Sequence, residues 1–241
     1  MRIQPPSMSY LQKQARAQEK RRVLLQFIAS ETYSDLNTCA ELLGVSETNV
    51  RATLKSLENV GAVTSEGHFI QGRQKLIFGI TSHGNGLLGL PENTFFKKSS
   101  VNSSYIQHTL QIQKIRIRAE RLGYSWTPIK VLRTWGLKKI PDALATDPSG
   151  KKISIEIERT IKSRKRYEEI ASAHLQARQK KLWDQVHYVC PKDGLAKRLK
   201  AIFLSIKTVP VEGARVALKP EHYSVFSFFD LSSWPKEKGG V

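Results

Sequence analysis

The stretch that decides the fold covers residues 139–159 and reads Lys-Ile-Pro-Asp-Ala-Leu-Ala-Thr-Asp-Pro-Ser-Gly-Lys-Lys-Ile-Ser-Ile-Glu-Ile-Glu-Arg. From residue 153 to 158 it alternates isoleucine with serine or glutamate, which places the two kinds of side chain on opposite faces of a β-strand. Pro148 and Gly150 favour a turn just before this strand, because proline presets φ and glycine adopts positive φ. The stretch therefore predicts a β-hairpin.

The register of this hairpin decides where its acidic side chains lie. A three-residue loop over 148–150 pairs Asp147 with Lys151, and counting outward in that register pairs Asp142 with Glu156. Directly paired residues share a face, with Cβ atoms roughly 4.5–5.5 Å apart. Glu158 lies on the same face, about 7 Å further along the strand. Because three acids repel one another unless a cation joins them, we expect Asp142, Glu156 and Glu158 to bind Mg²⁺ or Mn²⁺.

Two alternatives to this metal site stay open. A four-residue turn would place Asp142 on the isoleucine face instead, because a shift of one residue moves a side chain to the other side of a strand. The acids could also lie scattered on a solvent-exposed face. The chain has only 21 acidic residues against 39 basic ones, so a random distribution would rarely bring three acids together. This favours a site over scattered acids.

The spacing of the acids resembles a known nuclease core. Pro141-Asp142, then thirteen residues, then Glu156-x-Glu158, is similar to the PD-(D/E)xK motif of type II restriction enzymes. In that core an Asp and a Glu on adjacent strands hold the metal, and a Lys two residues further on activates water. Glu158 stands here in place of that Lys. This departure, with the basic segment that follows, resembles the MobC-type relaxases of mobilisable plasmids and the related replication–relaxation proteins.

The resemblance implies a fold and a set of site residues. It implies a restriction-endonuclease-like α/β domain over residues 104–235, in which Asp142, Glu156 and Glu158 are both metal ligands and catalytic groups. Lys162 would supply the catalytic charge that the missing Lys provides in the motif, and Arg159 is the alternative for that role. The basic helix after the motif would grip DNA phosphates through Arg159, Arg164, Lys165 and Arg166, although a solvated helix face is the simpler interpretation of such a run.

Charge and composition point to the class of partner. The net charge of +18 over 241 residues favours an anionic partner, and nucleic acid is the first candidate for a basic globular protein. No apolar run approaches the roughly 20 residues needed to span a bilayer, and the first residues lack the apolar segment of an export signal. The two cysteines, Cys39 and Cys190, are expected to be reduced core residues. We therefore expect a cytoplasmic protein without membrane insertion.

The N-terminal part predicts a winged helix-turn-helix domain over residues 1–90. A helix over 35–43, a tight turn at Gly44 and a second helix capped by Ser46 are followed by strand-like runs at 62–65 and 75–80. In the second helix the apolar stripe at helical spacing is expected to be buried, and it consists of Val50, Leu54, Leu57 and Val60. The residues expected to contact DNA are Asn49, Arg51 and Lys55 on that helix and Arg73 on the wing. Use of the domain for protein contact alone is the alternative.

Together these features predict an α+β protein in which residues 82–103 link the two domains. We expect a site-specific DNA-nicking relaxase that acts on double-stranded and nicked plasmid DNA at a transfer origin. Its expected partners are an accessory relaxosome protein and a coupling protein. The alternatives are a non-catalytic plasmid DNA-binding regulator or replication accessory protein, and a restriction-type double-strand endonuclease. A three-histidine metal site is disfavoured, since no two of the six histidines have ligand spacing; a tyrosine nucleophile such as Tyr167 stays open.

Overall fold

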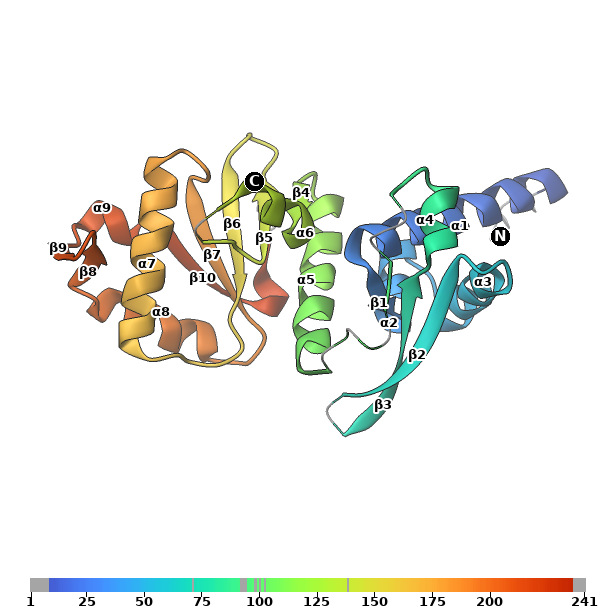
Figure 1. Cartoon of the computed structure of the whole chain (residues 1–241), viewed down its shortest axis with the longest axis horizontal. Helices are drawn as coiled ribbons and strands as arrows, with labels where there is room; N and C mark the ends of the chain where they lie inside the picture. Colours follow the sequence, from blue (N-terminus) through green and yellow to red (C-terminus); the bar gives the residue numbers. More distant parts are fainter. Residues whose placement is uncertain are drawn as a thin grey trace, which may run out of the picture. The chain divides into compact units, whose positions relative to one another are not determined.

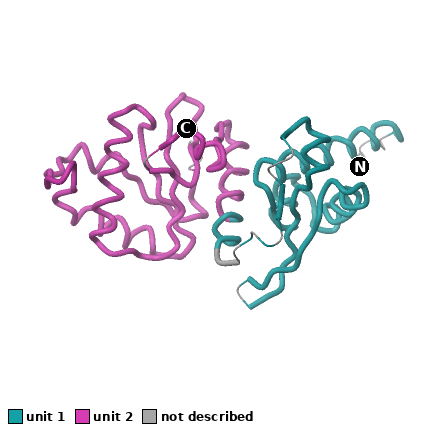
Figure 2. The backbone as a smooth tube through the Cα atoms, viewed as in Figure 1, with its two compact units in different colours: residues 1–110 teal, residues 111–241 magenta. Residues whose placement is uncertain are grey.

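The structure is a computed structural model of the whole chain. It describes residues 9–70, 72–91, 95–97, 99, 101, 103–137 and 139–235, without the side chains of 103 and 104. The chain divides into two compact units, residues 1–110 and 111–241, and both contain helices and sheets (Figure 2). The division falls inside helix α5 (Ser103–Arg121), whereas the sequence predicted domains over 1–90 and 104–235. No helix in the described part of the chain is long and apolar enough to cross a membrane.

Unit 1 combines four helices with a three-stranded antiparallel sheet of order β1-β3-β2, counting the described residues up to Pro91. Its elements are α1 (Tyr10–Glu31), β1 (Tyr33–Asp35), α2 (Leu36–Leu43), α3 (Glu47–Asn59), β2 (Val63–Ile70), β3 (Arg73–Ile80) and α4 (Ser82–Leu87). Helices α1, α2 and α3 pack their apolar faces on one another and on the inner ends of β2 and β3 (Figure 1). This packing leaves the outer ends of β2 and β3 as a projecting hairpin.

The α2–α3 pair forms as its capping residues dictate. The Asp35 carboxylate accepts the N–H of Thr38 at 2.8 Å and begins α2, and Gly44 ends it with φ 61°. Ser46 begins α3, as predicted. The expected apolar stripe of α3 is buried except for Val60, which is 57% exposed because the helix ends at Asn59 and the chain turns away.

Two parts of unit 1 differ from the sequence-based expectation. Strands β2 and β3 run Val63–Ile70 and Arg73–Ile80, longer than the predicted 62–65 and 75–80. Helix α4 occupies the start of the expected linker, because the Thr81 hydroxyl accepts the Gly84 N–H at 2.9 Å and caps a short helix there. Residues 92–94, 98, 100 and 102 of that linker lie outside the described residues.

Unit 2 is built around a five-stranded mixed sheet of order β10-β7-β6-β5-β4. Strands β4, β5 and β6 pair antiparallel, while β7 lies parallel to β6 and β10 lies parallel to β7. The strands are β4 (Ser125–Pro128), β5 (Ala143–Thr146), β6 (Lys152–Ile157), β7 (Gln185–Cys190) and β10 (Phe226–Asp230), with a separate hairpin of β8 (Thr208–Val211) and β9 (Ala214–Ala217). The helices after α5 are α6 (Ile129–Leu132), α7 (Arg164–Gln179), α8 (Leu195–Ser205) and α9 (Pro220–Tyr223).

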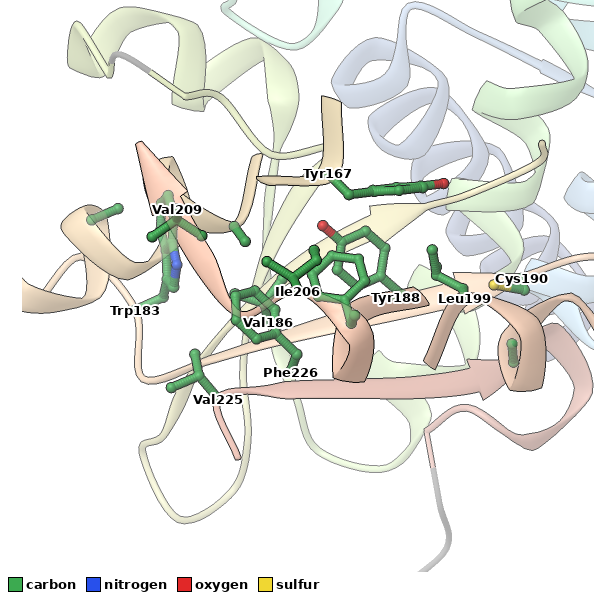
Figure 3. Close-up of a cluster of buried hydrophobic side chains, with 14 of the residues drawn as sticks. Tyr167, Trp183, Val186, Tyr188, Cys190, Leu199, Ile206, Val209, Val225 and Phe226 are labelled. Atoms are coloured by element: carbon green, nitrogen blue, oxygen red, sulfur yellow. The ribbon is translucent and has the colours of Figure 1, made fainter. Parts of the chain in front are cut away.

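Both faces of this sheet are covered. Helices α7 and α8 pack on one face, where Figure 3 shows Tyr167 of α7 and Tyr188 of β7 in the same apolar layer. The isoleucines of β6 face the other side and pack against α5 (Figure 1). The alternation of β6 therefore does not separate a buried face from a solvent-exposed face. It separates an apolar interior under α5 from a mixed interior under α7.

A hydrogen-bonded histidine on the α5 side gives stability a dependence on pH. The Trp234 indole donates to His187 Nδ1 at 2.9 Å, and His187 Nε2 lies 3.1 Å from Gln185 Oε1. Burial, reinforced by the nearby Lys151 ammonium, lowers the pKa of His187 to about 4. Between pH 6.5 and 4 the unfolded chain thus binds a proton that the folded chain does not, so stability falls as the pH falls through this window.

We expect His187 to account for about 3 kcal/mol of the stability lost between pH 7 and pH 4, from about 1.4 kcal/mol per pKa unit. Urea unfolding of the wild type and of His187→Asn at the two pH values measures this loss. The variant should lose less stability on acidification, and His83→Asn, at an exposed position, should behave as wild type. Equal losses in wild type and His187→Asn would contradict the assignment.

Candidate active site

The hairpin of β5 and β6 has the register that the sequence predicted. Asp147 N–H donates to the Lys151 carbonyl at 3.0 Å, and Gly150 closes the loop with φ 87°. Ala143 pairs with Ile155 in the ladder, and one step further Asp142 N–H donates to the Ile155 carbonyl at 3.1 Å. Asp142 therefore lies one residue before β5, beside the end of β6, and its carboxylate is close enough to His174 of α7 to affect it electrostatically.

Asp142 is tied to the neighbouring strand through its side chain. Its Oδ2 accepts the backbone N–H of Ile157 at 2.8 Å. This bond holds the carboxylate at the end of β6, in a half-buried position. The side chain is therefore not turned into the isoleucine layer, which was the consequence of a four-residue turn.

Glu156 lies in a buried group with a lysine and a histidine. Its Oε1 is 2.8 Å from Lys139 Nζ and 3.2 Å from Nε2 of the fully buried His174 on α7. These are contacts between charged or polar groups without hydrogen-bond geometry. Glu156 Oε1 and both ring nitrogens of His174 are thus buried without a hydrogen-bond partner in the described structure. Lys139 Nζ lies against this oxygen, so a further cation can bind there only when Lys139 moves away.

The electrostatics of this group favour a charged Glu156 and a neutral His174. Burial by itself raises the pKa of Glu156, but the contacts with His174 and Lys139 outweigh it and lower this pKa to about 2. Burial lowers the pKa of His174, and the nearby carboxylate offsets only part of that effect. At neutral pH the ion pair of the group is therefore Glu156 with Lys139.

Glu158 forms an ion pair with a different lysine, Lys162. Both of its carboxylate oxygens contact Lys162 Nζ, and the residue is only 4% exposed. The Tyr167 hydroxyl accepts the Lys162 backbone N–H at 3.1 Å and so holds the loop that carries this lysine. Tyr167 is fully buried, and burial raises its pKa to about 12. The structure therefore gives Tyr167 a supporting position and does not favour it as a nucleophile.

The carboxylate oxygens near the end of β6 are of the kind that a hard divalent cation such as Mg²⁺ prefers. Among the described residues, no three His, Cys, Asp or Glu side chains converge on one point, so the structure does not gather the three predicted acids. Mg²⁺, however, is commonly bound by one or two carboxylates that it shares with water and substrate phosphates. Asp142 and Glu156, whose carboxylates both lie near His174, supply two such carboxylates once Lys139 leaves Glu156. Glu158 does not, because Lys162 covers both of its oxygens.

The basic residues predicted to bind DNA phosphates lie around the start of α7. Arg164 Nε is 3.3 Å from Glu168 and its Nη2 donates to the Ser205 carbonyl at 2.8 Å, while Arg166 pairs with Glu169 at 2.9 Å. Arg164, Lys165 and Arg166 are exposed and Arg159 is half-buried. Because the exposed Arg166–Glu169 pair contributes only about 0–1 kcal/mol, phosphate can compete for the Arg166 guanidinium, whereas Glu168, the partner of Arg164, is buried.

Sequence reasoning missed two residues of the site, Lys139 and His174. His174 follows Tyr167 and Ala171 at helical spacing, so the buried stripe of α7 was the signal that could have placed it against the sheet. Lys139 lies in the loop before β5, where no strand or helix period applies. Its contact with Glu156 depends on the tertiary fold.

The DNA-contact candidates of unit 1 are all at its surface. Asn49 and Arg51 are exposed on α3 and Lys55 is exposed one turn further along, while Arg73 is exposed at the start of β3. A cavity of about 480 Å³ lies between α3 and β3, and Arg51 and Gln74 are among its lining residues. The groove is thus lined by residues of α3 and β3, with Asp35, Leu36 and Asn37 beside them.

Comparison with known proteins supplies the family. A family model described as replication-relaxation matches residues 25–186, which is well over half of the 241 residues and takes in parts of both units. No curated protein and no solved structure matches the chain. The matched range includes α2, α3 and the hairpin with Asp142, Glu156 and Glu158. The chain belongs to the replication-relaxation family.

Proposed function

We propose that this protein is a metal-dependent, site-specific DNA nickase that initiates plasmid mobilisation at a transfer origin, as MobC-type relaxases do. The family supports a role in plasmid replication or relaxation. The observation that carries the finer proposal is the position of Asp142 just before β5 and of Glu156 near the end of the adjacent strand β6, with both carboxylates close to His174 of α7. Two carboxylates in that relation form the metal-binding part of the PD-(D/E)xK motif.

The order of elements in unit 2 supports a nuclease-like core. Helix α5 precedes three antiparallel strands, β4 to β6, and α7 then crosses to the parallel strand β7. Asp142 lies just before the start of β5 and Glu156 near the end of β6, and α7 begins close after them with its basic residues. A restriction-endonuclease-like domain would need this placement to bring phosphates to the acids.

Unit 1 supports a winged helix-turn-helix that reads duplex DNA. Helix α3 follows α2 after a tight turn, and the β2–β3 hairpin takes the place of a wing. We propose that Asn49, Arg51 and Lys55 contact base edges and phosphates, and that Arg73 contacts the backbone beside them. Such base contacts would direct nicking to a defined DNA sequence.

The proposed chemistry assigns a role to each group of unit 2. Asp142 and Glu156 would hold Mg²⁺ or Mn²⁺, which supplies polarisation of the scissile phosphate and a more acidic bound water. Glu158 would hold the Lys162 ammonium in position. The Lys162 side chain is 43% exposed, so the ammonium could stabilise the negative charge that develops on the phosphate. Arg159, Arg164, Lys165 and Arg166 would bind the flanking phosphates. The protein would work in the cytoplasm with an accessory relaxosome protein and a coupling protein.

A plasmid nicking assay tests the proposal. Supercoiled plasmid carrying the origin is incubated with the protein and Mg²⁺ or Mn²⁺, and the products are separated on a gel. We expect open circles with wild type, none with EDTA, and none with Asp142→Ala combined with Glu156→Ala, provided circular dichroism shows a folded variant. Nicking that survives the double substitution would remove the site, and linear product would indicate a restriction-type endonuclease.

A second candidate function is a non-catalytic plasmid DNA-binding regulator or replication accessory protein. The observation that favours it is the pairing of Glu156 with Lys139 and of Glu158 with Lys162, which neutralises two acids within the protein itself. This candidate requires DNA affinity that is indifferent to divalent cations, and an absence of nicking under all the conditions above.

A further inference from the structure

The first half of helix α1 is exposed along its whole length. Residues 10–19, 21 and 22 are exposed and residue 20 is half-buried, with Tyr10 73% and Leu11 74% exposed. The buried residues of α1 begin only at Leu24. Figure 1 shows this part of α1, in blue, extending beyond the other helices of unit 1. We call residues 10–22 the basic arm.

Local interactions are sufficient to keep the basic arm helical. Ser9 and Gln12 form a capping box, in which each side chain accepts the backbone N–H of the other. The arm consists of strong helix formers, chiefly Gln, Ala, Lys and Arg. Glu19 and Arg22 add an ion pair one turn apart at 2.6 Å. The packed second half of α1 serves as the nucleus from which the arm extends.

The arm presents a stripe of positive charge. It carries five basic residues and a single acidic residue, Glu19, which Arg22 already neutralises. Lys13, Arg16 and Lys20 recur at spacings of three and four, so they lie within about 60° of one another around the helix axis. At 1.5 Å per residue the stripe is about 10 Å long. No large apolar residue occurs between residues 12 and 22, so the arm lacks the apolar stripe that helix packing or membrane binding needs.

The arm is rigidly connected to the proposed DNA-reading helix. Leu24, Leu25 and Ile28 of α1 share one buried cluster with Val50 and Leu54 of α3. A helix that continues without interruption from this cluster keeps a constant direction relative to α3. The position of the arm relative to DNA bound at α3 would thus be constant.

From the exposure, the charge stripe and the rigid connection, we propose that the basic arm is a second DNA-contact element, which binds the phosphate backbone of duplex DNA through Lys13, Arg16 and Lys20. Duplex DNA carries one charge per ~1.7 Å of its axis, so a rigid row of three cations about 10 Å long can engage several phosphates. The contact carries no base information and should strengthen all sequences alike. It rests on the DNA binding of the proposed function and is independent of nicking.

The salt dependence of DNA binding tests the arm. Fluorescence anisotropy with an origin duplex and with an unrelated duplex is measured across a salt series for wild type and for Lys13→Ala, Arg16→Ala and Lys20→Ala combined. Each lost phosphate contact lowers the slope of log affinity against log salt by about 0.9, so we expect a decrease of about 2 to 3. Both duplexes should lose affinity by the same factor, about tenfold or more at moderate salt.

A matched control separates the arm from a general effect of charge. Lys197, Arg198 and Lys200 are exposed on α8, and their replacement by alanine removes the same three charges. This control should keep the wild-type slope, and equal losses in both variants would overturn the proposal. An unchanged slope in the arm variant would overturn the arm alone, while a wild type that binds no DNA would overturn the proposed function as well. A changed oligomeric state with unchanged DNA affinity would overturn DNA contact by the arm and assign it to protein contact instead.

Discussion

Replacement of Asp142 by asparagine is expected to slow nicking by about 10³-fold or more while the fold and the DNA affinity stay close to wild type. The amide oxygen of asparagine can still accept the Ile157 N–H that Asp142 Oδ2 accepts at 2.8 Å, so the end of the hairpin keeps its bond. What is lost is the negative charge of the Asp142 carboxylate. Cation binding at a phosphoryl centre contributes several kcal/mol to catalysis, and each ~1.4 kcal/mol is a factor of ten in rate.

The measurement is the initial rate of open-circle formation at saturating protein, together with anisotropy for DNA affinity. Asp147→Asn is the matched control, since Asp147 belongs to the other end of the same hairpin, where it accepts the Ser149 N–H at 2.8 Å. That control should nick at the wild-type rate. Nicking by Asp142→Asn at a rate within about threefold of wild type would show that the Asp142 charge has no part in the reaction.

Glu156→Gln is expected to lower the free energy of unfolding by about 2 kcal/mol in the absence of divalent cations. Breaking a buried ion pair costs roughly 3–5 kcal/mol, and the Lys139 ammonium recovers part of its hydration when it is left unpaired. The 25% exposure of the Lys139 side chain allows that recovery. Three unpaired acids, the arrangement that the sequence predicts, would give the opposite sign, because loss of one charge would relieve their repulsion.

Urea unfolding in EDTA measures this change. Glu169→Gln is the control, since Glu169 forms an exposed ion pair with Arg166, with side chains 41% and 61% exposed. Pairs of that kind contribute about 0–1 kcal/mol, so the control should stay within that range of wild type. If Glu156→Gln were as stable as wild type or more stable in EDTA, the ion pair with Lys139 would not be the state of the metal-free protein.

Much of the candidate site could be predicted because it depends on local pattern. Pro148 and Gly150 determined the loop, the loop determined the register of Ala143 with Ile155, and this register brought Asp142 to the end of β6. Ser46 similarly identified the start of α3. Each of these inferences uses residues within a few positions of one another, where φ preferences and strand periodicity act directly.

The rest could not be predicted because it depends on what packs against the hairpin. The alternation of β6 has the same appearance whether its polar face meets water or a helix, and α7 covers that face here. The partners of Glu156 come from a loop and from a helix later in the chain, Lys139 and His174. Helix α4 shows the same limit on a small scale, since its glycines and serine have the composition of a linker, yet Thr81 caps a helix.

The family model matches parts of both units, and the proposed roles of the two units differ. The proposed DNA-contact elements are exposed on α3, on the β2–β3 hairpin and on the basic arm, and Glu156 and Glu158 are held in ion pairs with lysines. Access of a cation to Glu156 therefore requires Lys139 to move. The proposed nicking reaction requires a divalent cation to replace the Lys139 ammonium at Glu156 and to bind Asp142 as well.

The most direct measurement is a crystal structure of the protein with bound Mn²⁺, located by its anomalous scattering at a concentration that supports nicking. The account expects one strong peak within about 2.0–2.6 Å of carboxylate oxygens of both Asp142 and Glu156, with Lys139 Nζ displaced from Glu156. A structure in which the 2.8 Å contact of Lys139 with Glu156 persists, with Mn²⁺ bound elsewhere or not at all while the same sample nicks DNA, would contradict it.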